Sequence, residues 1–486
     1  MRFFMSRVAI SSGAARRSLL QRLRPVIIRE GGNRSSNSSS RFVLRAALSS
    51  ASEIETPHVR VADPRSLRQL RNAIASSSSS TAVSASGGDT SALAELIRAA
   101  GTTMSASSAE RGNEYEAAAA AELFCDACRH DPAGSARVWV ERYPAETLDR
   151  ALRNIMRCDA DGLSILVEQR GHLLRLKGEK RNDGSMASLE KSDAALKSML
   201  GVLFSPSLLT VERVDLTSPG TLLEKIIRYE KVRPYSTLDH FKRRLGPGRR
   251  CFALFHPSIP GEPLAFVHCA LLKTIAPDLK YIQDNTGNSW NASQANAAVF
   301  YSISSTQPGL QGSGVDLGAV LLKRAVSFLS SEFRDTLDTF STLSPMPRFV
   351  PWVNQVLASS ELSALHSVDK DAAENIKAFL SDSNGKGNLA KPHIMRLAAA
   401  YLLNEKNGRG GILCPVGNFH VRNGARIGRI NWMGDPSKLG RTQSGCVMVN
   451  YHYPLDHLEE NRRSYGEDGI VAVTKDVQKL LTIDGI

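Results

Sequence analysis

The sequence feature that most constrains the fold is a glycine-rich turn that separates a strand-like run from a helical one. Residues 307–318 read Gln-Pro-Gly-Leu-Gln-Gly-Ser-Gly-Val-Asp-Leu-Gly, and an apolar stripe with helical spacing follows over 314–333. Strand-like runs bounded by Gly, Pro or Ser lie at residues 252–256, 263–272, 297–304 and 339–344. A strand, a glycine turn, a helix and another strand in this order predict a mixed α/β or α+β domain over residues 205–486.

The glycine turn is suited to binding a phosphate group. Gly312 and Gly314 let the backbone approach a ligand, and the free N–H groups of a first helical turn attract anions. A dinucleotide fingerprint would need glycine where the chain has Leu317, and no Lys-Ser/Thr pair follows to make a P-loop. The turn is close to the Gln-x-x-Gly-x-Gly turn with which acetyltransferase-type folds hold coenzyme A, and a purely structural turn is the alternative. The candidate coenzyme A contacts are Gln311, Gly312, Gly314, Val315, Asp316, Leu317 and Gly318.

Residues 91–204 have the pattern of an all-α bundle. Apolar residues repeat at helical spacing over 148–155, 163–174 and 196–203, with few β-branched runs between them. Cys125 and Cys128 form a CxxC, but no second CxxC or His pair stands at zinc spacing, so two cysteines on one helix face are favoured and no metal is assigned. For this region we predict a packing or oligomerisation role.

The basic charge of the chain is concentrated at its N-terminus. The formal net charge is +13, and residues 1–50 hold ten Arg, no Lys and one acid, Glu30. This Ser-rich, acid-poor composition is typical of an organellar import peptide, with a disordered basic tail as the alternative. Residues 51–90, including the serine run 76–80, read as a disordered linker. From the import peptide we expect a mitochondrial matrix location, and the last residues lack a Ser-Lys-Leu-type peroxisomal address. No run reaches the ~18 apolar residues of a membrane span.

The same charge suggests an organellar RNA-binding protein as a rival interpretation. An RNP-type strand is missing and only 6% of the residues are aromatic, so stacking platforms for bases are poorly supplied and we expect no nucleic acid partner. We predict that most of the clustered basic residues lie on a solvated or core-lid surface, with one or two as candidates for the 3′-phosphate of coenzyme A. These are Lys242, Arg243, Arg244, Arg249 and Arg250, and then Arg422, Arg426 and Arg429.

Two segments contain candidate catalytic side chains. Residues 340–347 (Phe-Ser-Thr-Leu-Ser-Pro-Met-Pro) end a strand with Ser344 fixed before two prolines, where a local hydrogen-bonding role in a turn is the ordinary interpretation. Residues 414–424 (Cys-Pro-Val-Gly-Asn-Phe-His-Val-Arg-Asn-Gly) contain His420, and a lone histidine in such a setting is commonly structural.

Taken together, the segments resemble the malonyl-CoA decarboxylase family from about residue 211 to 453. The matching segments are residues 241–251, 260–264, 300–304, 309–312, 340–347, 414–425, 429–433 and 449–451. The resemblance implies a helical N-terminal domain, an acetyltransferase-like (GNAT) mixed α/β catalytic domain, and a homotetramer built as a dimer of dimers. It implies conversion of malonyl-CoA to acetyl-CoA and CO2, a carboxy-lyase activity that removes malonyl-CoA and so regulates fatty-acid metabolism.

Site residues follow from the resemblance position by position. The catalytic serine falls on Ser344, the catalytic histidine on His420 and the acidic member on Asp316. A second active-site serine, a further histidine and a tyrosine fall on Ser302, His256 and Tyr453. The chain departs from the family pattern in having Asp316 in place of Glu and in inserting Ser313-Gly314, which puts the role of Asp316 in question.

The chemistry of this reaction suits these residue types. Loss of CO2 leaves negative charge on the thioester oxygen, so the site must supply neutral donors and later a proton to carbon. Because the thioester is itself the electron sink, we expect no metal and no cofactor. An arginine on the departing carboxylate would stabilise the ground state more than the transition state. We therefore expect Ser344 and His420 to hold the carboxylate, His420 to protonate the enolate, and Asp316 to orient one of them.

Three further points stay open at the level of sequence. A coenzyme-A-dependent acyltransferase on the same fold is the nearer rival, because a fold does not fix its reaction. Selectivity against methylmalonyl-CoA depends on one methyl group and cannot be read from the residues. The resemblance also places a family cysteine at Cys251, which suggests a redox-sensitive disulfide between subunits.

Overall fold

The computed structural model of the chain describes residues 113–136, 145–178, 186–284, 290–366, 368–381 and 387–481. The predicted import peptide of residues 1–50 and the predicted linker of residues 51–90 lie outside these ranges. Within them, no helix is both long and apolar enough to cross a membrane.

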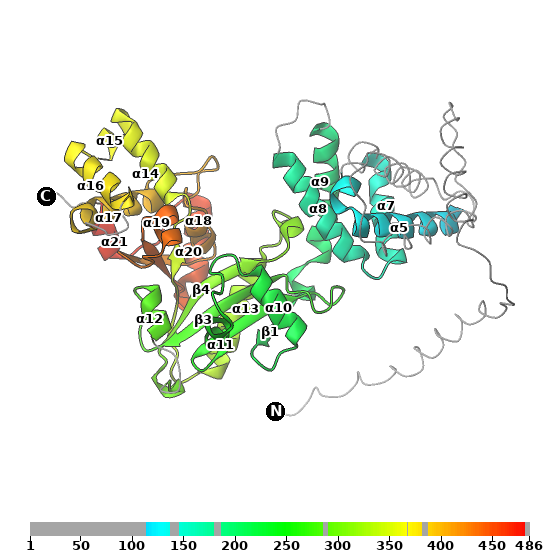
Figure 1. The fold of residues 1–486 in the computed structure, drawn as a ribbon, viewed down its shortest axis with the longest axis horizontal. Helices are drawn as coiled ribbons and strands as arrows, with labels where there is room; N and C mark the ends of the chain where they lie inside the picture. Colours follow the sequence, from blue (N-terminus) through cyan, green and yellow to red (C-terminus); the bar gives the residue numbers. More distant parts are fainter. Residues whose placement is uncertain are drawn as a thin grey trace. The chain divides into compact units, whose positions relative to one another are not determined.

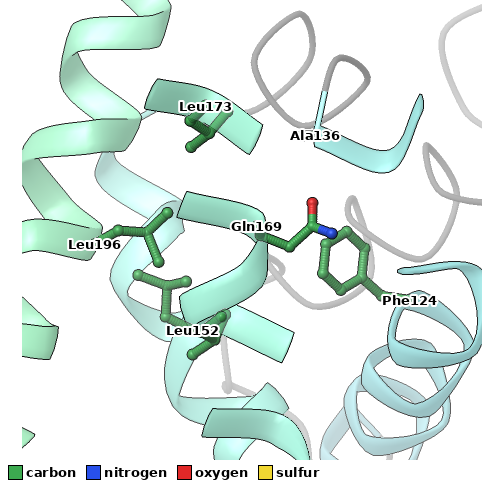
Figure 2. Close-up of a pocket in the computed structure, with 7 residues that line it drawn as sticks. Phe124, Ala136, Leu152, Gln169, Leu173 and Leu196 are labelled. Atoms are coloured by element: carbon green, nitrogen blue, oxygen red, sulfur yellow. The ribbon is translucent and has the colours of Figure 1, made fainter. Parts of the chain in front are cut away.

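The first described part of the chain is helical (Figure 1). Its helices are α5 (Asn113–His130), α7 (Ala145–Cys158), α8 (Gly162–Gly178) and α9 (Met186–Leu203). The helices that the apolar spacing predicts over 148–155, 163–174 and 196–203 are confirmed by α7, α8 and α9. Figure 2 shows Phe124, Leu152, Leu173 and Leu196 gathered with Gln169 between these helices. This interior is apolar and tightly packed, as expected of amphipathic helices that bury one face.

The two cysteines of the CxxC lie on one helix, as predicted. Cys125 and Cys128 are both on α5 and both buried. Burial raises the pKa of the Cys125 and Cys128 thiols, so neither is a ready nucleophile.

The second part is built on one mixed sheet. Its strands are β1 (Thr210–Val214), β2 (Arg249–Phe255), β3 (Ala265–Leu272), β4 (Ala297–Ser305), β5 (Thr339–Thr342), β6 (Ser344–Pro345), β7 (Arg426–Asn431) and β8 (Met448–His452). Their order is β1-β2-β3-β4-β5-β8-β6, with β7 paired to β8. The β4–β5 pair is parallel and the other pairs are antiparallel. The predicted mixed α/β class is confirmed, because the helix after the glycine turn carries the chain between two parallel strands.

Helices cover both faces of this sheet. Helix α13 (Leu317–Glu332) packs on the face that includes Phe252 and Leu254 of β2. Helices α10 (Gly220–Tyr229) and α11 (Leu238–Leu245) pack on the other face, with Cys251, Ala253 and Phe255. Alternate residues of one strand thus supply two cores, and β2 is buried along its whole length.

Further helices lie mostly between β5 and the C-terminus. They are α12 (Leu279–Asp284), α14 (Phe349–Ala358), α15 (Ser360–Leu365), α16 (Lys370–Ser381), α17 (Gly387–Leu403), α18 (Pro415–Arg422), α19 (Lys438–Ser444), α20 (Leu458–Asp468) and α21 (Lys475–Lys479). Short 3-10 turns are η1 (Pro206–Leu208), η2 (Ala292–Gln294), η3 (Pro308–Leu310) and η4 (Leu455–His457). Strand-like runs and helical spacing in the sequence predict β2 to β5 and α13, but not β1, β7 or β8.

Most of the clustered basic residues are exposed, as predicted, but three residues of the first cluster are buried. Arg244, Arg249 and Arg250 are buried, whereas Lys242 and Arg243 are exposed. Burial is possible because carboxylates distant in the sequence meet two of these cations: Glu230 lies 3.1 Å from Arg244, and Glu332 binds Arg250. Such partners satisfy charges that would otherwise stay in water.

The position of Cys251 argues against a disulfide between subunits through this residue. The thiol is fully buried on β2 beneath α10 and α11, and burial raises its pKa. A sulfur in that position cannot reach a second subunit without opening the core.

Candidate functional site

Ser344, His420 and Tyr453 form a continuous hydrogen-bonded chain. Ser344 Oγ lies 3.2 Å from His420 Nε2, and His420 Nδ1 lies 2.7 Å from the Tyr453 hydroxyl. Ser344 begins β6, His420 is on α18, and Tyr453 follows β8, so the site assembles residues from three separate segments. All three side chains are buried.

Local sequence explains why His420 reaches this position. Helix α18 starts with Pro415 at its first position, and its cap is Cys414, whose sulfur accepts a bond from the Gly417 N–H. A side chain at Gly417 would stand 3.1 Å from the Tyr451 hydroxyl, so glycine lets the helix lie against β8. The helix ends at Arg422 with Asn423 as its C-cap, and His420 therefore sits in its last turn.

The surroundings of His420 keep its imidazole neutral. The ring stacks on Tyr451 at 4.5 Å between centroids and meets Phe419 edge-on at 5.0 Å. Burial lowers the pKa of His420 to about 3. Burial, with the nearby charge of Asp316, raises the pKa of Tyr453, so the phenol also stays neutral at physiological pH.

The hydrogen bonds favour one direction of donation. Ser344 Oγ donates to Thr342 Oγ1 at 3.0 Å, and that oxygen also accepts the Tyr451 N–H at 3.2 Å. With its proton directed at Thr342, Ser344 accepts from His420 Nε2–H, while the neutral Tyr453 hydroxyl donates to Nδ1. We assign the Nε2–H tautomer on this basis.

Asp316 links the start of α13 to the helix that carries His420. Its carboxylate caps α13 by accepting the Ala319 N–H at 3.0 Å and forms an ion pair with Arg422 at 3.3 Å. A side chain at Gly318 would stand 2.9 Å from the ring of Phe419, so α13 and α18 approach closely there. The structure thereby brings Asp316, His420 and Tyr453 into one region.

The glycine turn presents an open backbone at the start of α13. Gly312 and Gly314 have φ of +66° and +96°, the left-handed region that favours glycine, and a Cβ on either would meet no atom within 4 Å. Gln311 is exposed, Val315 and Gly318 are half-buried, and Leu317 is buried in the core. The helix dipole and the N–H groups of the first turn that Asp316 does not bind make this turn chemically able to hold a phosphate.

A family model described as the malonyl-CoA decarboxylase C-terminal domain matches residues 207–485, which include every residue of this site. The chain belongs to the malonyl-CoA decarboxylase family. Among curated proteins, the mitochondrial malonyl-CoA decarboxylase of goose (Anser anser anser) is 38% identical over 326 residues, and that of mouse (Mus musculus) is 39% identical over 325. These alignments cover 63% of the chain and 63% and 65% of the relatives, so they span less than two thirds of the relatives' length.

Solved malonyl-CoA decarboxylase structures have the same fold. The crystal structure from Rhodopseudomonas palustris superposes with a TM-score of 0.63 at 30% identity, covering 82% of this chain and 100% of that one. The crystal structure from Cupriavidus metallidurans gives 0.62 at 30% identity, covering 81% and 99%.

The family resemblance also assigns Ser302 to the site, but the structure directs this side chain elsewhere. Ser302 Oγ donates to Glu230 Oε2 at 2.7 Å, on the face of the sheet that carries α10 and α11. The β3–β4 register shifts between His268 and Cys269, opposite Tyr301, and such a bulge re-aims the side chains after it. Ser302 is therefore not joined to the Ser344–His420 chain.

His256 is likewise occupied by backbone. Its Nε2 bonds the Leu203 carbonyl at 3.0 Å, its Nδ1 accepts the Ser258 N–H at 3.1 Å, and its ring packs on Phe204. Burial lowers its pKa. His256 borders a hollow of about 640 Å³ at the junction of the helices and β2. There its imidazole is neutral, and backbone groups occupy both ring nitrogens.

Several residues in and around the site are not predicted by the sequence. Thr342 stands in the segment that resembles malonyl-CoA decarboxylases, and strand alternation could have placed it on the same face as Ser344. Tyr451 similarly shares a strand face with Tyr453. Nothing in the local sequence marked Glu230, which meets Ser302 from 72 residues away. Over the described ranges, no cluster of three or more His, Cys, Asp or Glu side chains has an arrangement able to hold a metal ion.

Proposed function

We propose that the chain is a malonyl-CoA decarboxylase, a carboxy-lyase that converts malonyl-CoA to acetyl-CoA and CO2. The observation that carries the proposal is the buried Ser344–His420–Tyr453 chain beside the open glycine turn of α13. In this reaction the bond between Cα and the carboxylate breaks, and its electron pair moves into the thioester as an enolate. A proton then adds to Cα, and the thioester leaves as acetyl-CoA.

The neutral state of His420 suits this charge flow. The side chains that contact Ser344 and His420 are uncharged: Thr342, Tyr453, Tyr451 and Phe419. A cation in their place would hold the carboxylate of the ground state more tightly than the transition state, in which that charge disperses. Neutral donors fixed in a dry site stabilise the developing enolate oxygen instead.

We assign His420 Nε2–H as the proton source for Cα, with solvent water returning a proton to Nε2 after each turnover, and Ser344 as the group that, with His420, positions the carboxylate. The Tyr453 hydroxyl holds the tautomer by donating to Nδ1. Asp316 contributes through the α13 cap and Arg422 at the mouth of the site. We omit Ser302 and His256 from the catalytic set, because backbone and Glu230 occupy their polar atoms.

The coenzyme A moiety would bind at the start of α13. Its phosphates would meet the backbone of residues 311–318, where Gly312 and Gly314 leave the approach open. Because the thioester accepts the electron pair, the reaction as proposed uses no metal and no further cofactor.

The finer architecture is also part of the proposal. The glycine turn between the parallel strands β4 and β5 supports a GNAT-like catalytic domain over residues 205–486. The mutual packing of α5, α7, α8 and α9 supports a helical bundle domain over 91–204. Assembly as a dimer of dimers rests on the family resemblance.

A mitochondrial matrix location is proposed on two grounds. The relatives from goose and mouse are named mitochondrial, and residues 1–50 are Arg-rich and nearly free of acids. In that compartment the activity would remove malonyl-CoA and so act in fatty-acid metabolism.

The direct test is to supply the full chain with malonyl-CoA and measure CO2 and acetyl-CoA. Methylmalonyl-CoA, run in parallel, measures selectivity for one methyl group, which is worth only about 1–3 kcal/mol. An amine acceptor with acetyl-CoA tests the acyltransferase alternative. Folded protein that yields no CO2 from either substrate would defeat the proposal.

A further inference from the structure

A buried arginine of the helical part reaches the glycine turn of the catalytic part. Arg170 lies on α8, and its side chain is only 2% exposed. Its Nε donates to Asp193 of α9 at 2.9 Å. Its Nη1 donates to the carbonyl oxygens of Gly309 and Gln311, the latter at 2.8 Å. One guanidinium therefore joins two helices to the turn that precedes α13.

The bonds to Arg170 fix the direction of the turn's N–H groups. In a trans peptide the carbonyl and the N–H of the same unit point in opposite directions. With the Gln311 carbonyl held by Arg170, the N–H of Gly312 must point away from Arg170. Gly312 has a φ of +66° and open space at its Cβ position. Arg170 thus presets a donor on the exposed side of the turn.

Close backbone contacts support the same turn at positions where only glycine fits. A Cβ on Gly309 would stand 1.7 Å from the Val167 carbonyl oxygen of α8, and Gly171 lies beside the Gly309 backbone. On α9, a Cβ on Gly201 would stand 2.7 Å from the Ser313 carbonyl oxygen. Both helices therefore touch the turn through backbone, and Ser313 belongs to the insertion relative to the family pattern.

Stability alone does not explain a buried arginine at this place. Removing two charges from water costs several kcal/mol, and an apolar pair of similar size is often as stable. The planar fork of arginine, in contrast, can hold one carboxylate and two carbonyls at fixed angles, which a lysine ammonium does not. The arrangement thus specifies geometry in the turn.

We propose that Arg170, held by Asp193, is a positioning residue for the coenzyme A phosphates. By fixing the carbonyls of Gly309 and Gln311, it shapes the turn that receives them. The helical part is then a component of the substrate site and has more than the packing role expected from its sequence. This inference rests on the proposed function, because it takes coenzyme A as the ligand of the turn.

The experiment compares Arg170→Met, Arg170→Lys and Asp193→Asn with the control Arg129→Met in the full chain. Arg129 pairs with Asp159 at 2.6 Å in the same helical part, and its bonds go to Asp126 and Asp159. The control therefore removes an equal charge and an ion pair without touching the turn. The readouts are the Kd of coenzyme A by calorimetry, kcat and KM for malonyl-CoA, and amide exchange of residues 309–318.

We expect Arg170→Met to raise the Kd and the KM by about tenfold or more, with a smaller change in kcat. Amide exchange should accelerate in residues 309–318, and Arg170→Lys should recover only part of the loss. Arg129→Met should leave all these values near wild type. If Arg170→Met does not fold, Arg170→Lys and Asp193→Asn carry the same expectation.

Unchanged Kd, KM and exchange in any folded Arg170 variant would overturn the inference. Equal effects in Arg129→Met would also overturn it, since they would report general destabilisation. Wild-type protein that binds coenzyme A but releases no CO2 would defeat the proposed function and leave the inference testable through Kd and exchange. Wild-type protein that binds no coenzyme A would overturn both.

Discussion

The Tyr453 hydroxyl lies 2.7 Å from His420 Nδ1, on the side of the imidazole opposite Ser344. Because burial raises the pKa of this phenol, it is a hydroxyl donor and not a phenolate acceptor. Donation to Nδ1 leaves the ring proton on Nε2, where it faces Ser344. A tyrosine thus determines which nitrogen of the histidine can release a proton.

Tyr453→Phe should lower kcat about tenfold with little change in KM. The variant keeps the ring in the core but removes one hydrogen bond, worth about 1 kcal/mol, and lets the imidazole tautomer vary. Steady-state kinetics with malonyl-CoA check this. Tyr235→Phe is a matched control, because it removes a tyrosine–histidine bond of the same 2.7 Å length at His268, on the other face of the sheet. Equal losses in both variants would argue against a specific role of Tyr453.

Ser344→Ala should reduce kcat by about 10²-fold, because the variant loses the group that positions the carboxylate and accepts the His420 Nε2–H. The neighbouring Ser341→Ala serves as control: Ser341 is buried too, but its hydroxyl donates to the Thr342 carbonyl, at 3.3 Å, and not to His420. Circular dichroism should show both variants folded. Wild-type turnover by Ser344→Ala would remove Ser344 from the mechanism.

The activity should not titrate near the ordinary histidine pKa. Because burial lowers the pKa of His420 to about 3, the ring is already neutral at pH 6. We therefore expect kcat to be flat between about pH 6 and 8, without the acid limb of an unperturbed histidine. A kcat profile that falls below pH 6.5 while the protein stays folded would contradict the neutral donor.

The free energy of unfolding, unlike kcat, should depend on pH in this range. Unfolded, His420 takes up a proton below about 6.5, whereas folded it does so only near 3, so acid favours unfolding across that interval. His420→Gln should flatten the dependence of the unfolding free energy on pH between 6.5 and 5. Burial lowers the pKa of His268 and His452 as well, so part of the slope should remain. Urea titrations of the wild type and of His420→Gln at several pH values measure this dependence.

Much of the fold is readable from the sequence, because continuous apolar runs and helical spacing directly reflect burial. The strands β2, β3 and β4 and the helix α13 fall within two or three residues of the predicted ranges. The Ser344–His420 contact spans 76 residues, and no periodicity specifies such a pair, so only the family resemblance suggested it. The resemblance in turn gave no warning of the bulge opposite Tyr301, which leaves Ser302 bonded to Glu230.

Glu230→Ala should lower the free energy of unfolding by about 3–5 kcal/mol, because it leaves the buried Arg244 cation without its carboxylate. The Glu230 side chain is fully buried and also receives Ser302 and Ser304, at 2.7 and 3.2 Å. Asp284→Ala, which breaks the exposed pair with Lys280, should unfold near wild type. Urea denaturation of both variants measures the two free energies of unfolding. If Glu230→Ala is as stable as Asp284→Ala, Arg244 finds another partner.

Asp316→Asn separates the two contacts of that side chain. Asparagine caps a helix about as well as aspartate, so α13 should keep its start, but the variant carries no charge opposite Arg422. Since a carboxylate at this end of the helix repels phosphates and occupies Arg422, we expect the KM for malonyl-CoA to fall severalfold at low salt, with kcat nearly unchanged. Asp316→Ala, which also loses the cap, should raise KM. A drop in kcat for Asp316→Asn with KM unchanged would instead show that the charge orients Tyr453 and His420 during the reaction.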